Sequence, residues 1–502
     1  MKTIYLLTTA ILFILTGCFS DTDKVDYNAY NVLTLSDDKA GEEREKLIRV
    51  DRFFTLKLTP TIAQSQEGNE SNLEFNWRIR ENTVALNPYP YRNIGSTRNL
   101  EFEVDVAVGI HRIIYSVTDK ITGVTKFLYY NIEVIGEYTK GWTILEEVSG
   151  GGDISMILPT GRIVRNIYSR ENGVFLETPC VSLSISNHAN MKKIFVLTAT
   201  QGVECSREEY TKLTEFADWF VPGTAPTPAE TRPKLYVFTV YLYGGLVNNG
   251  NYHARVGGGF PGDPAFGGAI PAPVETDGFR KEYNIAPFIV GRTDGSTATS
   301  RPMQIIYDNL QQRFLYLILE GLTPCLKYFP YDAATDPWNP GNTGMSLAYM
   351  GNSNVVSMHN ALMYDSVGDL FVVKFSSDAV YLATTRFTQS IAGAPSILKG
   401  FSTAVNSKVL DHMYVAVGNK IHHYDIPGSS SVEAYAFGAN ENIIRMHTVN
   451  NSGAETLYVA TYDGSQGRVY YFPLEPSGSI TNNTYSEKFE GFGKIVDLQY
   501  KE

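Results

Sequence analysis

Positive charge and cysteine are both scarce in this sequence, and each scarcity excludes a class of protein. Charged residues make up 19% of the 502 residues and the formal net charge is −11, so no basic surplus is available to neutralise a phosphate backbone. We therefore predict that the protein does not bind nucleic acid.

The four cysteines show no C-x-x-C spacing, which argues against a zinc site and a disulfide framework. Cys180 and Cys205 are predicted to be separate buried thiols, with a bond across neighbouring strands as the alternative.

Catalytic and cofactor motifs are also missing. No H-E-x-x-H, G-x-S-x-G, P-loop or EF-hand spacing occurs. Residues 257–262 spell G-x-G-x-x-G, but no strand precedes them, no helix follows, and Pro261 interrupts them. His422 and His423 are adjacent on an expected strand, so they face opposite sides and cannot hold one ion together. We predict no catalytic residue, no metal site and no cofactor, although a carboxylate pair assembled from distant loops stays open.

Hydrophobic runs are short, and the clearest of them lies at the N-terminus. Residues 4–15 are almost entirely apolar and follow Met1 and Lys2, whereas a bilayer span needs roughly 20 apolar residues. A basic start, a short apolar core and small residues before a cleavage site predict a secretory signal over residues 1–18. The sequence Leu15-Thr16-Gly17-Cys18 resembles a bacterial lipobox, in which the cysteine becomes the first mature residue and carries acyl chains. A secreted protein with a chance cysteine is the alternative.

The lipobox resemblance implies a membrane location. Each buried CH₂ of an acyl chain contributes about 0.8 kcal/mol, so more than one chain on Cys18 gives a durable anchor. Residues 19–26 are polar and acidic, which predicts a solvated tether, and they resemble the surface-export signals of Bacteroidetes lipoproteins. We therefore expect a lipid-anchored outer-membrane protein on the cell surface, with the periplasmic face as the alternative.

Aromatic residues and glycine are abundant, and they indicate an all-β protein. The chain has 32 Tyr, 26 Phe and 43 Gly with few long helical patterns. Apolar and polar residues alternate over residues 73–79 and 100–106, as in strands with one buried face. Two further strand-like runs, 110–117 and 127–134, flank a turn-forming segment. Residues 27–137 are therefore predicted to form an immunoglobulin-like sandwich.

Several segments of this first unit carry a family resemblance. Asn76-Trp77-Arg78, then residues 109–119, then Thr122-Gly123 stand in the order of a PKD-type sandwich. Residues 141–147 are similar to the junction seen in PKD-like lipoproteins of Bacteroidetes. That family is largely without assigned chemistry, and the resemblance implies a spacer or adhesive module. Trp77 is accordingly expected in the core rather than on a ligand-binding surface.

A strand type with an aromatic at its second position recurs through the rest of the chain. The aromatics are Phe195, Tyr236, Tyr316, Phe371, Tyr414 and Tyr458. Three of the intervals are 41, 43 and 44 residues, the period of four-stranded propeller blades. The interval of 80 residues after Tyr236 is interpreted as two periods with one degenerate copy around Phe288.

These intervals predict a β-propeller of about seven blades over residues 138–502. Residues 142–145 supply the opening strand. Residues 494–500 are expected to complete the first blade, because ring closure removes exposed sheet edges. A pair of sandwiches or a β-helix is the alternative.

Long insertions interrupt the repeat, and they contain the candidate ligand-binding residues. The insertions span residues 211–232, 248–278 and 331–344. Trp219 and Trp338 lie in polar, Pro-containing loops, with Tyr328 and Tyr331 close to the second. An exposed aromatic ring can stack on a sugar face or anchor a protein partner. The alternative is that each tryptophan packs its insertion against the propeller.

Taken together, the sequence predicts a non-catalytic cell-surface lipoprotein that binds a glycan or protein ligand, with the PKD-like domain as spacer. A propeller-type polysaccharide hydrolase or lyase is one alternative, and a structural adhesion module that docks a partner is another. The expected partners are a glycan or surface protein, the membrane through the N-terminal lipid, and an outer-membrane transport complex.

Overall fold

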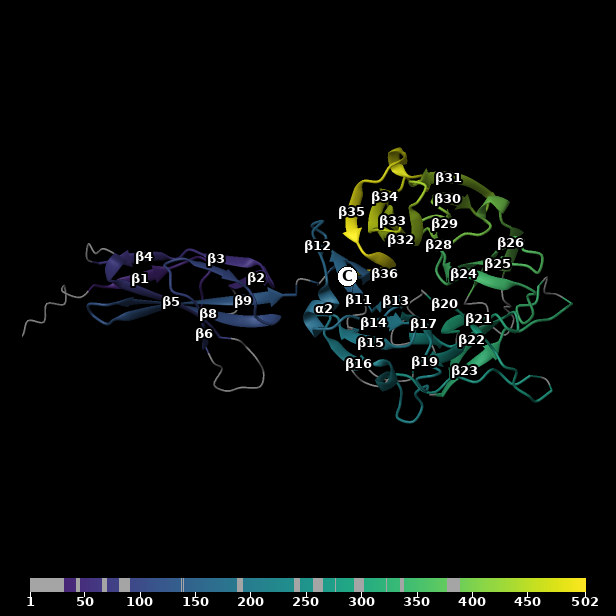
Figure 1. The fold of residues 1–502 in the computed structure, drawn as a ribbon, viewed down its shortest axis with the longest axis horizontal. Coiled ribbons are helices and arrows are strands. Elements are labelled where there is room, and N and C mark those ends of the chain that lie inside the picture. Colours follow the sequence, from purple (N-terminus) through teal and green to yellow (C-terminus); the bar gives the residue numbers. More distant parts are fainter. Residues whose placement is uncertain are drawn as a thin grey trace, which may run out of the picture. The chain divides into compact units, whose positions relative to one another are not determined.

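The computed structural model describes most of the chain in two compact units, Met1–Glu137 and Tyr138–Glu502 (Figure 1). The described residues are 31–41, 46–65, 70–80, 91–136, 138, 140–186, 193–238, 244–255, 265–275, 277–292, 302–321, 323–334, 338–376 and 389–502. The signal segment, Cys18, the tether and residues 257–262 lie outside them. Over the described ranges, no helix has the length and hydropathy needed to cross a bilayer.

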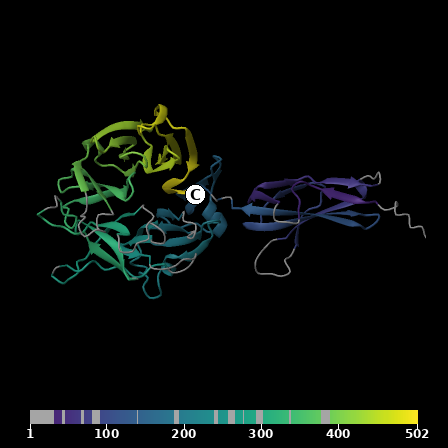
Figure 2. The same cartoon turned by 180° about the vertical axis from the view of Figure 1, so that it is seen from behind.

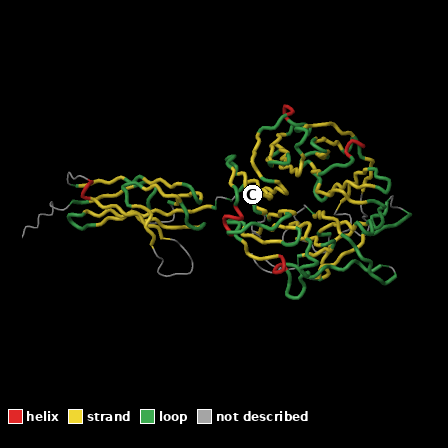
Figure 3. Tube along the Cα trace, viewed as in Figure 1, coloured by secondary structure: helices red, strands yellow, loops and turns green. Residues whose placement is uncertain are grey.

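Strands dominate both units (Figure 3), as predicted for an all-β chain. Helical structure in the described residues is limited to short pieces. They are η2 (Glu70–Asn72), α2 (Ile167–Asn172), η3 (Phe216–Trp219), η4 (Ser396–Leu398) and η5 (Thr481–Asn483).

The first unit is a β-sandwich. Its larger sheet has, in order, β2 (Leu47–Asp51), β9 (Thr125–Ile135), β8 (Gly109–Asp119), β5 (Leu73–Arg80) and β6 (Tyr91–Gly95). The two shorter pairs are β1 (Leu33–Ser36) with β4 (Thr61–Gln64), and β3 (Thr55–Leu58) with β7 (Leu100–Glu103). β2 runs parallel to β9, and the other pairs are antiparallel.

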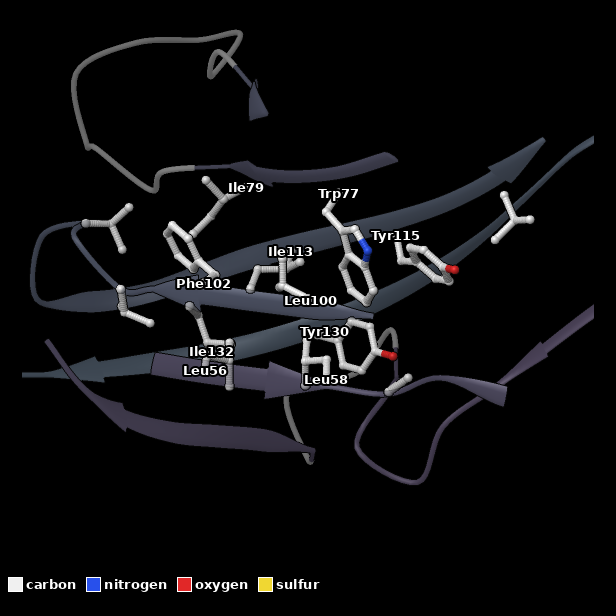
Figure 4. Close-up of a cluster of buried hydrophobic side chains, with 14 of the residues drawn as sticks. Leu56, Leu58, Trp77, Ile79, Leu100, Phe102, Ile113, Tyr115, Tyr130 and Ile132 are labelled. Carbon is white, nitrogen blue, oxygen red and sulfur yellow. The ribbon is translucent and has the colours of Figure 1, made fainter. Parts of the chain in front are cut away.

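The sandwich core forms where the alternating residues of β5 and β8 face the short strands (Figure 4). Trp77 is fully buried, and its ring stacks on that of Tyr115 at a centroid distance of 4.0 Å. Its indole Nε1 donates a hydrogen bond to the carbonyl of Thr97 at 2.8 Å, which satisfies the one polar atom that burial would otherwise leave unpaired. Trp77 is therefore a core residue, as predicted.

The second unit consists of seven antiparallel sheets, which are the blades of a propeller (Figures 1 and 2). Strands are given from the innermost outward. Blade 1 contains β36 (Lys494–Lys501), β10 (Gly141–Val148), β11 (Gly151–Ile157) and β12 (Ile163–Val164). Blade 2 contains β13 (Cys180–Ile185), β14 (Lys193–Thr198), β15 (Gly202–Ser206) and β16 (Lys212–Glu215), and blade 3 contains β17 (Pro233–Phe238), β18 (Gly244–Asn248) and β19 (Asn251–Ala254).

Blades 4 to 7 continue the pattern with four strands each. Blade 4 contains β20 (Ile285–Gly291), β21 (Gln304–Asp308), β22 (Arg313–Glu320) and β23 (Thr323–Tyr328). Blade 5 contains β24 (Ser346–Asn352), β25 (Met358–Tyr364), β26 (Leu370–Ser376) and β27 (Gln389–Gly393). Blade 6 contains β28 (Thr403–Asn406), β29 (His412–Val417), β30 (Lys420–Asp425) and β31 (Ser430–Ala436). Blade 7 contains β32 (Asn442–Asn451), β33 (Ala454–Tyr462), β34 (Gly467–Pro473) and β35 (Glu487–Phe492).

The ring is closed by the C-terminal strand. β36 pairs with β10 in the first blade, with Trp142 opposite Tyr500. Each innermost strand contacts the next one around the ring, and β32 contacts β36, which completes the circle. The propeller and its closure by residues 494–500 are therefore confirmed.

The recurring aromatic does not occupy equivalent strands, although one occurs in each of blades 2 to 7. It lies on the first strand of its blade in blade 3, on the second in blades 2, 6 and 7, and on the third in blades 4 and 5. Inner strands are covered on both faces by neighbouring blades, so the same apolar pattern suits several positions. The interval of 80 residues after Tyr236 therefore contains no degenerate blade, and Phe288 belongs to β20, the innermost strand of blade 4.

The three insertions lie between the outer part of one blade and the innermost strand of the next. Residues 211–232 include β16 and lead to β17, residues 248–278 include β19 and lead toward β20, and residues 331–344 follow β23 and lead to β24.

Cys180 and Cys205 are free, buried thiols, which confirms the favoured interpretation. Burial raises the pKa of the Cys180 thiol to about 12 and also raises that of Cys205. Both cysteines are therefore core residues of blade 2, with thiols that stay protonated at neutral pH.

Candidate functional site

A cavity of about 340 Å³ lies at the centre of the propeller. All seven innermost strands contribute to its wall. Alternate residues of a strand point to the same side, so each innermost strand can present residues i and i+2 to the cavity. Its size falls in the range of small-molecule sites.

Two adjacent strands supply the Arg, Asp, His and Gln side chains of this wall. Arg445 and His447 are alternate residues of β32, and Asp497 and Gln499 are alternate residues of β36. We call these four residues the polar sector. They lie side by side because β32 and β36 are neighbours where the ring closes.

Asp497 organises the polar sector. Its side chain is 6% exposed, and its Oδ1 lies 3.2 Å from Nε of Arg445. Its Oδ2 accepts a hydrogen bond from the backbone N–H of Leu183 at 3.0 Å, and its Oδ1 accepts one from the N–H of Leu498 at 3.0 Å. One carboxylate thus connects blades 7, 1 and 2, and its oxygens are occupied by donors.

His447 is a neutral member of the polar sector. Burial lowers the pKa of its imidazole to about 4, although the charge of Asp497 opposes that shift. The centre of the ring lies 5.8 Å from that of Trp142. At neutral pH the charges of the sector are therefore those of Arg445 and Asp497.

Apolar side chains line much of the rest of the cavity. We call the following half-buried residues the apolar wall: Ile185 on blade 2, Leu235 and Val237 on blade 3, Phe288 on blade 4 and Val405 on blade 6. Ring order places blade 4 farthest from the junction of blades 7 and 1. The cavity therefore offers an ionic group at that junction and hydrocarbon on several of the other blades.

The carboxylates of the cavity bear on the hydrolase alternative. Hydrolysis of a glycosidic bond uses two carboxyl groups about 5–10 Å apart, whereas Asp497 is the one carboxylate among the described residues that line the cavity. Within the described part of the chain, no group of three or more His, Cys, Asp or Glu residues is placed to hold a metal ion.

His422 and His423, on β30, do not meet. His422 is buried, while Nε2 of His423 lies 2.7 Å from Nδ1 of His412 on the adjacent strand β29. The two neighbours therefore face opposite sides of their sheet, as their adjacency on a strand requires.

Trp219 packs its insertion against the propeller. It is 1% exposed and meets the ring of Phe195 edge-on at a centroid distance of 4.6 Å. Its carbonyl accepts hydrogen bonds from the N–H groups of Ala265 and Phe266 at 2.7 and 2.8 Å, so the first two insertions are tied together. Its ring is not available to stack on a ligand in this structure.

The other three candidates gather around blade 4, away from the axis. The hydroxyl of Tyr328 donates to Oε1 of Glu275 at 2.7 Å, which ties the second insertion to β23. Trp338 is half-buried, with its ring 5.8 Å from that of Phe314. Tyr331 is 42% exposed, whereas Tyr328 and Trp338 are half-buried and Trp219 is buried. The structure brings none of the four into the axial cavity.

The polar sector was not identified from the sequence. A signal exists, because Arg445-Met446-His447 and Asp497-Leu498-Gln499 both alternate polar and apolar residues within strands. Such alternation usually indicates one solvated face. The sequence does not show which strand of a blade is innermost, so it could not show that this polar face lines a cavity.

The N-terminal region matches a known family. Residues 18–179 match the model of the PKD-like family, and the match continues beyond the sandwich through β12 and α2. This region is similar to that family, as its motifs implied. No curated protein sequence matches the chain.

Solved structures of similar form include a quinonprotein alcohol dehydrogenase-like protein from Bacteroides thetaiotaomicron. It is 10% identical, with 94% of this chain and 99% of that chain covered and a TM-score of 0.44. Apo AztD from Citrobacter koseri is 11% identical, with 85% and 97% covered and a TM-score of 0.36. The β-propeller domain of Cps50 (Swd1) from Myceliophteria thermophila is 8% identical, with 64% and 91% covered and a TM-score of 0.36. Likenesses this distant support no functional argument, and the propeller is defined by its own strand order.

Proposed function

We propose that this protein is a non-catalytic binding protein of the cell surface, in which the propeller captures a ligand and the PKD-like sandwich acts as a spacer. The observation that carries the proposal is the axial cavity, which combines a polar sector at the junction of blades 7 and 1 with an apolar wall on blades 2, 3, 4 and 6. A concave, mostly apolar site with a few convergent polar groups is the usual form of a ligand site.

The lipid anchor is part of this proposal. Cys18 would carry the acyl chains, residues 19–26 would form the tether, and the protein would face outward from the outer membrane. The signal-like residues 1–18 support this placement, and the family match begins at Cys18. An outer-membrane transport complex is a suitable partner for a binding protein in that position.

Labelling with a fatty-acid analogue in the native host tests the anchor. Wild-type protein should be labelled and should be digested when protease is added to intact cells, whereas Cys18→Ala should not be labelled. Labelled protein that only becomes sensitive after cell lysis would instead place it on the periplasmic face.

Titration of the purified mature chain against panels of polysaccharides and surface glycoproteins tests capture. We expect saturable binding to a member of one panel, without turnover of that ligand. The readouts are calorimetry for binding and chromatography of the ligand for cleavage. No binding to any member of either panel, or release of shorter fragments of the ligand, would overturn the proposal.

A further inference from the structure

We propose that the axial cavity binds a monocarboxylate that carries an apolar body, with the carboxylate on Arg445 and the body against the apolar wall. This rests on the proposed function and names the chemistry of its ligand. The free acid and the C-terminal residue of a polypeptide share that chemistry.

Arg445 has hydrogen-bonding capacity left for a ligand. Its Nε faces Asp497 at 3.2 Å, and its side chain is 42% exposed. Among the described residues, Asp497 is its sole hydrogen-bond or ion-pair partner, so its two terminal nitrogens remain available. A guanidinium presents paired N–H groups that match the two oxygens of a carboxylate.

The surroundings fix Arg445 in place. Asp497 is itself held by the backbone N–H groups of Leu183 and Leu498, so the guanidinium is attached to a rigid carboxylate. An oriented donor loses little conformational freedom when it binds a ligand. This arrangement is that of a preorganised anion site.

The number of cationic side chains that line the cavity indicates which kind of anion it can bind. Arg445 is the one cationic side chain among the described residues that line the cavity, and His447 is neutral at ordinary pH. A phosphate carries up to two charges and three or more acceptor oxygens, which a single guanidinium beside Asp497 does not balance. A singly charged, planar carboxylate fits the available donors better.

The apolar wall selects the rest of the ligand. Phe288 lies on the blade opposite the polar sector, Leu235 and Val237 lie on the blade next to it, and Val405 lies on blade 6. A sugar ring on this surface would leave several buried hydroxyls without hydrogen-bond partners, which is unfavourable. A hydrocarbon body instead gains free energy in proportion to the apolar area removed from water.

Calorimetric titration of the mature chain with octanoate and with octanamide tests the charge requirement. The two probes have the same body and differ in the anionic group. We expect octanoate to bind at least tenfold more tightly, because a hydrogen bond to a charged group contributes about 1.5–3 kcal/mol. Equal affinities, or no binding of octanoate, would overturn the proposal.

Two variants locate the site. Arg445→Gln should weaken octanoate binding at least tenfold and remove the preference over the amide. Arg170→Gln is the matched control: Arg170 is 43% exposed and lies 3.5 Å from Glu171, on α2 and outside the cavity wall. Unchanged binding in Arg445→Gln would place the acid elsewhere and refute this site.

Because Arg445→Gln also removes the partner of Asp497, Phe288→Ala supplies an independent measurement. It should weaken octanoate several-fold while the preference for acid over amide stays intact. If Phe288→Ala has no effect in a folded variant, the apolar wall is not the binding surface. Circular dichroism spectra that superimpose on the wild-type spectrum establish that each variant is folded.

A C-terminal hexapeptide ending in leucine, compared with its C-terminal amide, distinguishes the two sources of the carboxylate. Tighter binding of the peptide acid than of octanoate assigns a polypeptide end, and the reverse order assigns a free acid. Failure of every acid, with binding to a glycan or glycoprotein retained, would refute this inference and leave the proposed function standing.

Discussion

Gly202, at the start of β15, lies where any side chain would collide with Trp219. A Cβ atom at this position would be 2.6 Å from Cη2 of Trp219 and 3.1 Å from a methyl group of Leu197. The absence of a side chain here leaves room for the indole to pack against blade 2. A residue that was a ligand candidate in the sequence thus turns out to depend on a glycine for its place in the core.

Gly202→Ala should therefore destabilise the propeller by about 1–3 kcal/mol, the usual cost of overpacking. Gly393→Ala is the control, because a Cβ at this strand glycine would meet no atom within 4 Å. Urea denaturation of both variants measures the difference. Equal stabilities would mean that Trp219 can move without loss.

His359 predicts a pH dependence. It is fully buried on β25, and burial lowers the pKa of its imidazole to about 3. The unfolded chain, with a pKa near 6.5, binds a proton between about pH 6.5 and pH 3 while the folded chain does not. Stability must therefore fall as the pH falls through this window, by about 1.4 kcal/mol per pH unit from this residue alone.

A comparison of wild type with His359→Gln, by urea denaturation at intervals from pH 7 to pH 4, isolates this contribution from that of the carboxylates. The variant should lose stability less steeply over this range. Parallel curves would show that the imidazole is protonated in the folded protein.

At the level of elements, β36 is the most consequential strand. It pairs with β10, supplies Asp497 to the cavity, and places Lys494 beside Glu147 at 2.9 Å. Without it, β10 becomes an exposed sheet edge, and such edges promote aggregation.

Removal of residues 494–502 should therefore give an aggregating protein without a cooperative propeller transition. Lys494→Gln is the control, since it loses only a surface ion pair of about 0–1 kcal/mol. Size-exclusion chromatography and thermal denaturation distinguish the two. A monomeric, cooperatively folding truncation would show that the ring is stable when open.

The elements also show what could be predicted from sequence. The alternation of Leu73, Phe75, Trp77 and Ile79 defines a buried face by itself, so β5 and the sandwich core were predictable. The number of blades could be predicted, but the strand of each blade that carries the aromatic could not, because aromatic residues suit several strands of a blade. The axial site could not be predicted from the sequence, because it depends on which seven strands are innermost and on the contact between distant β32 and β36.

At the level of the whole molecule, the two units have separate hydrophobic cores. The sandwich core is centred on Trp77, whereas the propeller has a series of clusters between its blades. Units with separate cores can unfold independently.

Calorimetry of the mature chain should accordingly show two transitions, and Trp77→Ala should shift only one of them. A large-to-small change at a buried tryptophan costs about 3–5 kcal/mol, so that transition should move to much lower temperature or disappear. A single transition that shifts as a whole would mean that the units unfold together.

The first blade is assembled from both ends of the propeller sequence, with β36 from the last residues and β10 to β12 from the first. During synthesis, the sandwich strands are complete once Ile135 has emerged, so that unit can fold early. The propeller cannot close until β36 (Lys494–Lys501) has emerged and paired with β10. A chain that crosses a membrane unfolded would therefore finish folding only on the far side, and any truncation by premature termination would leave a ring that cannot shut.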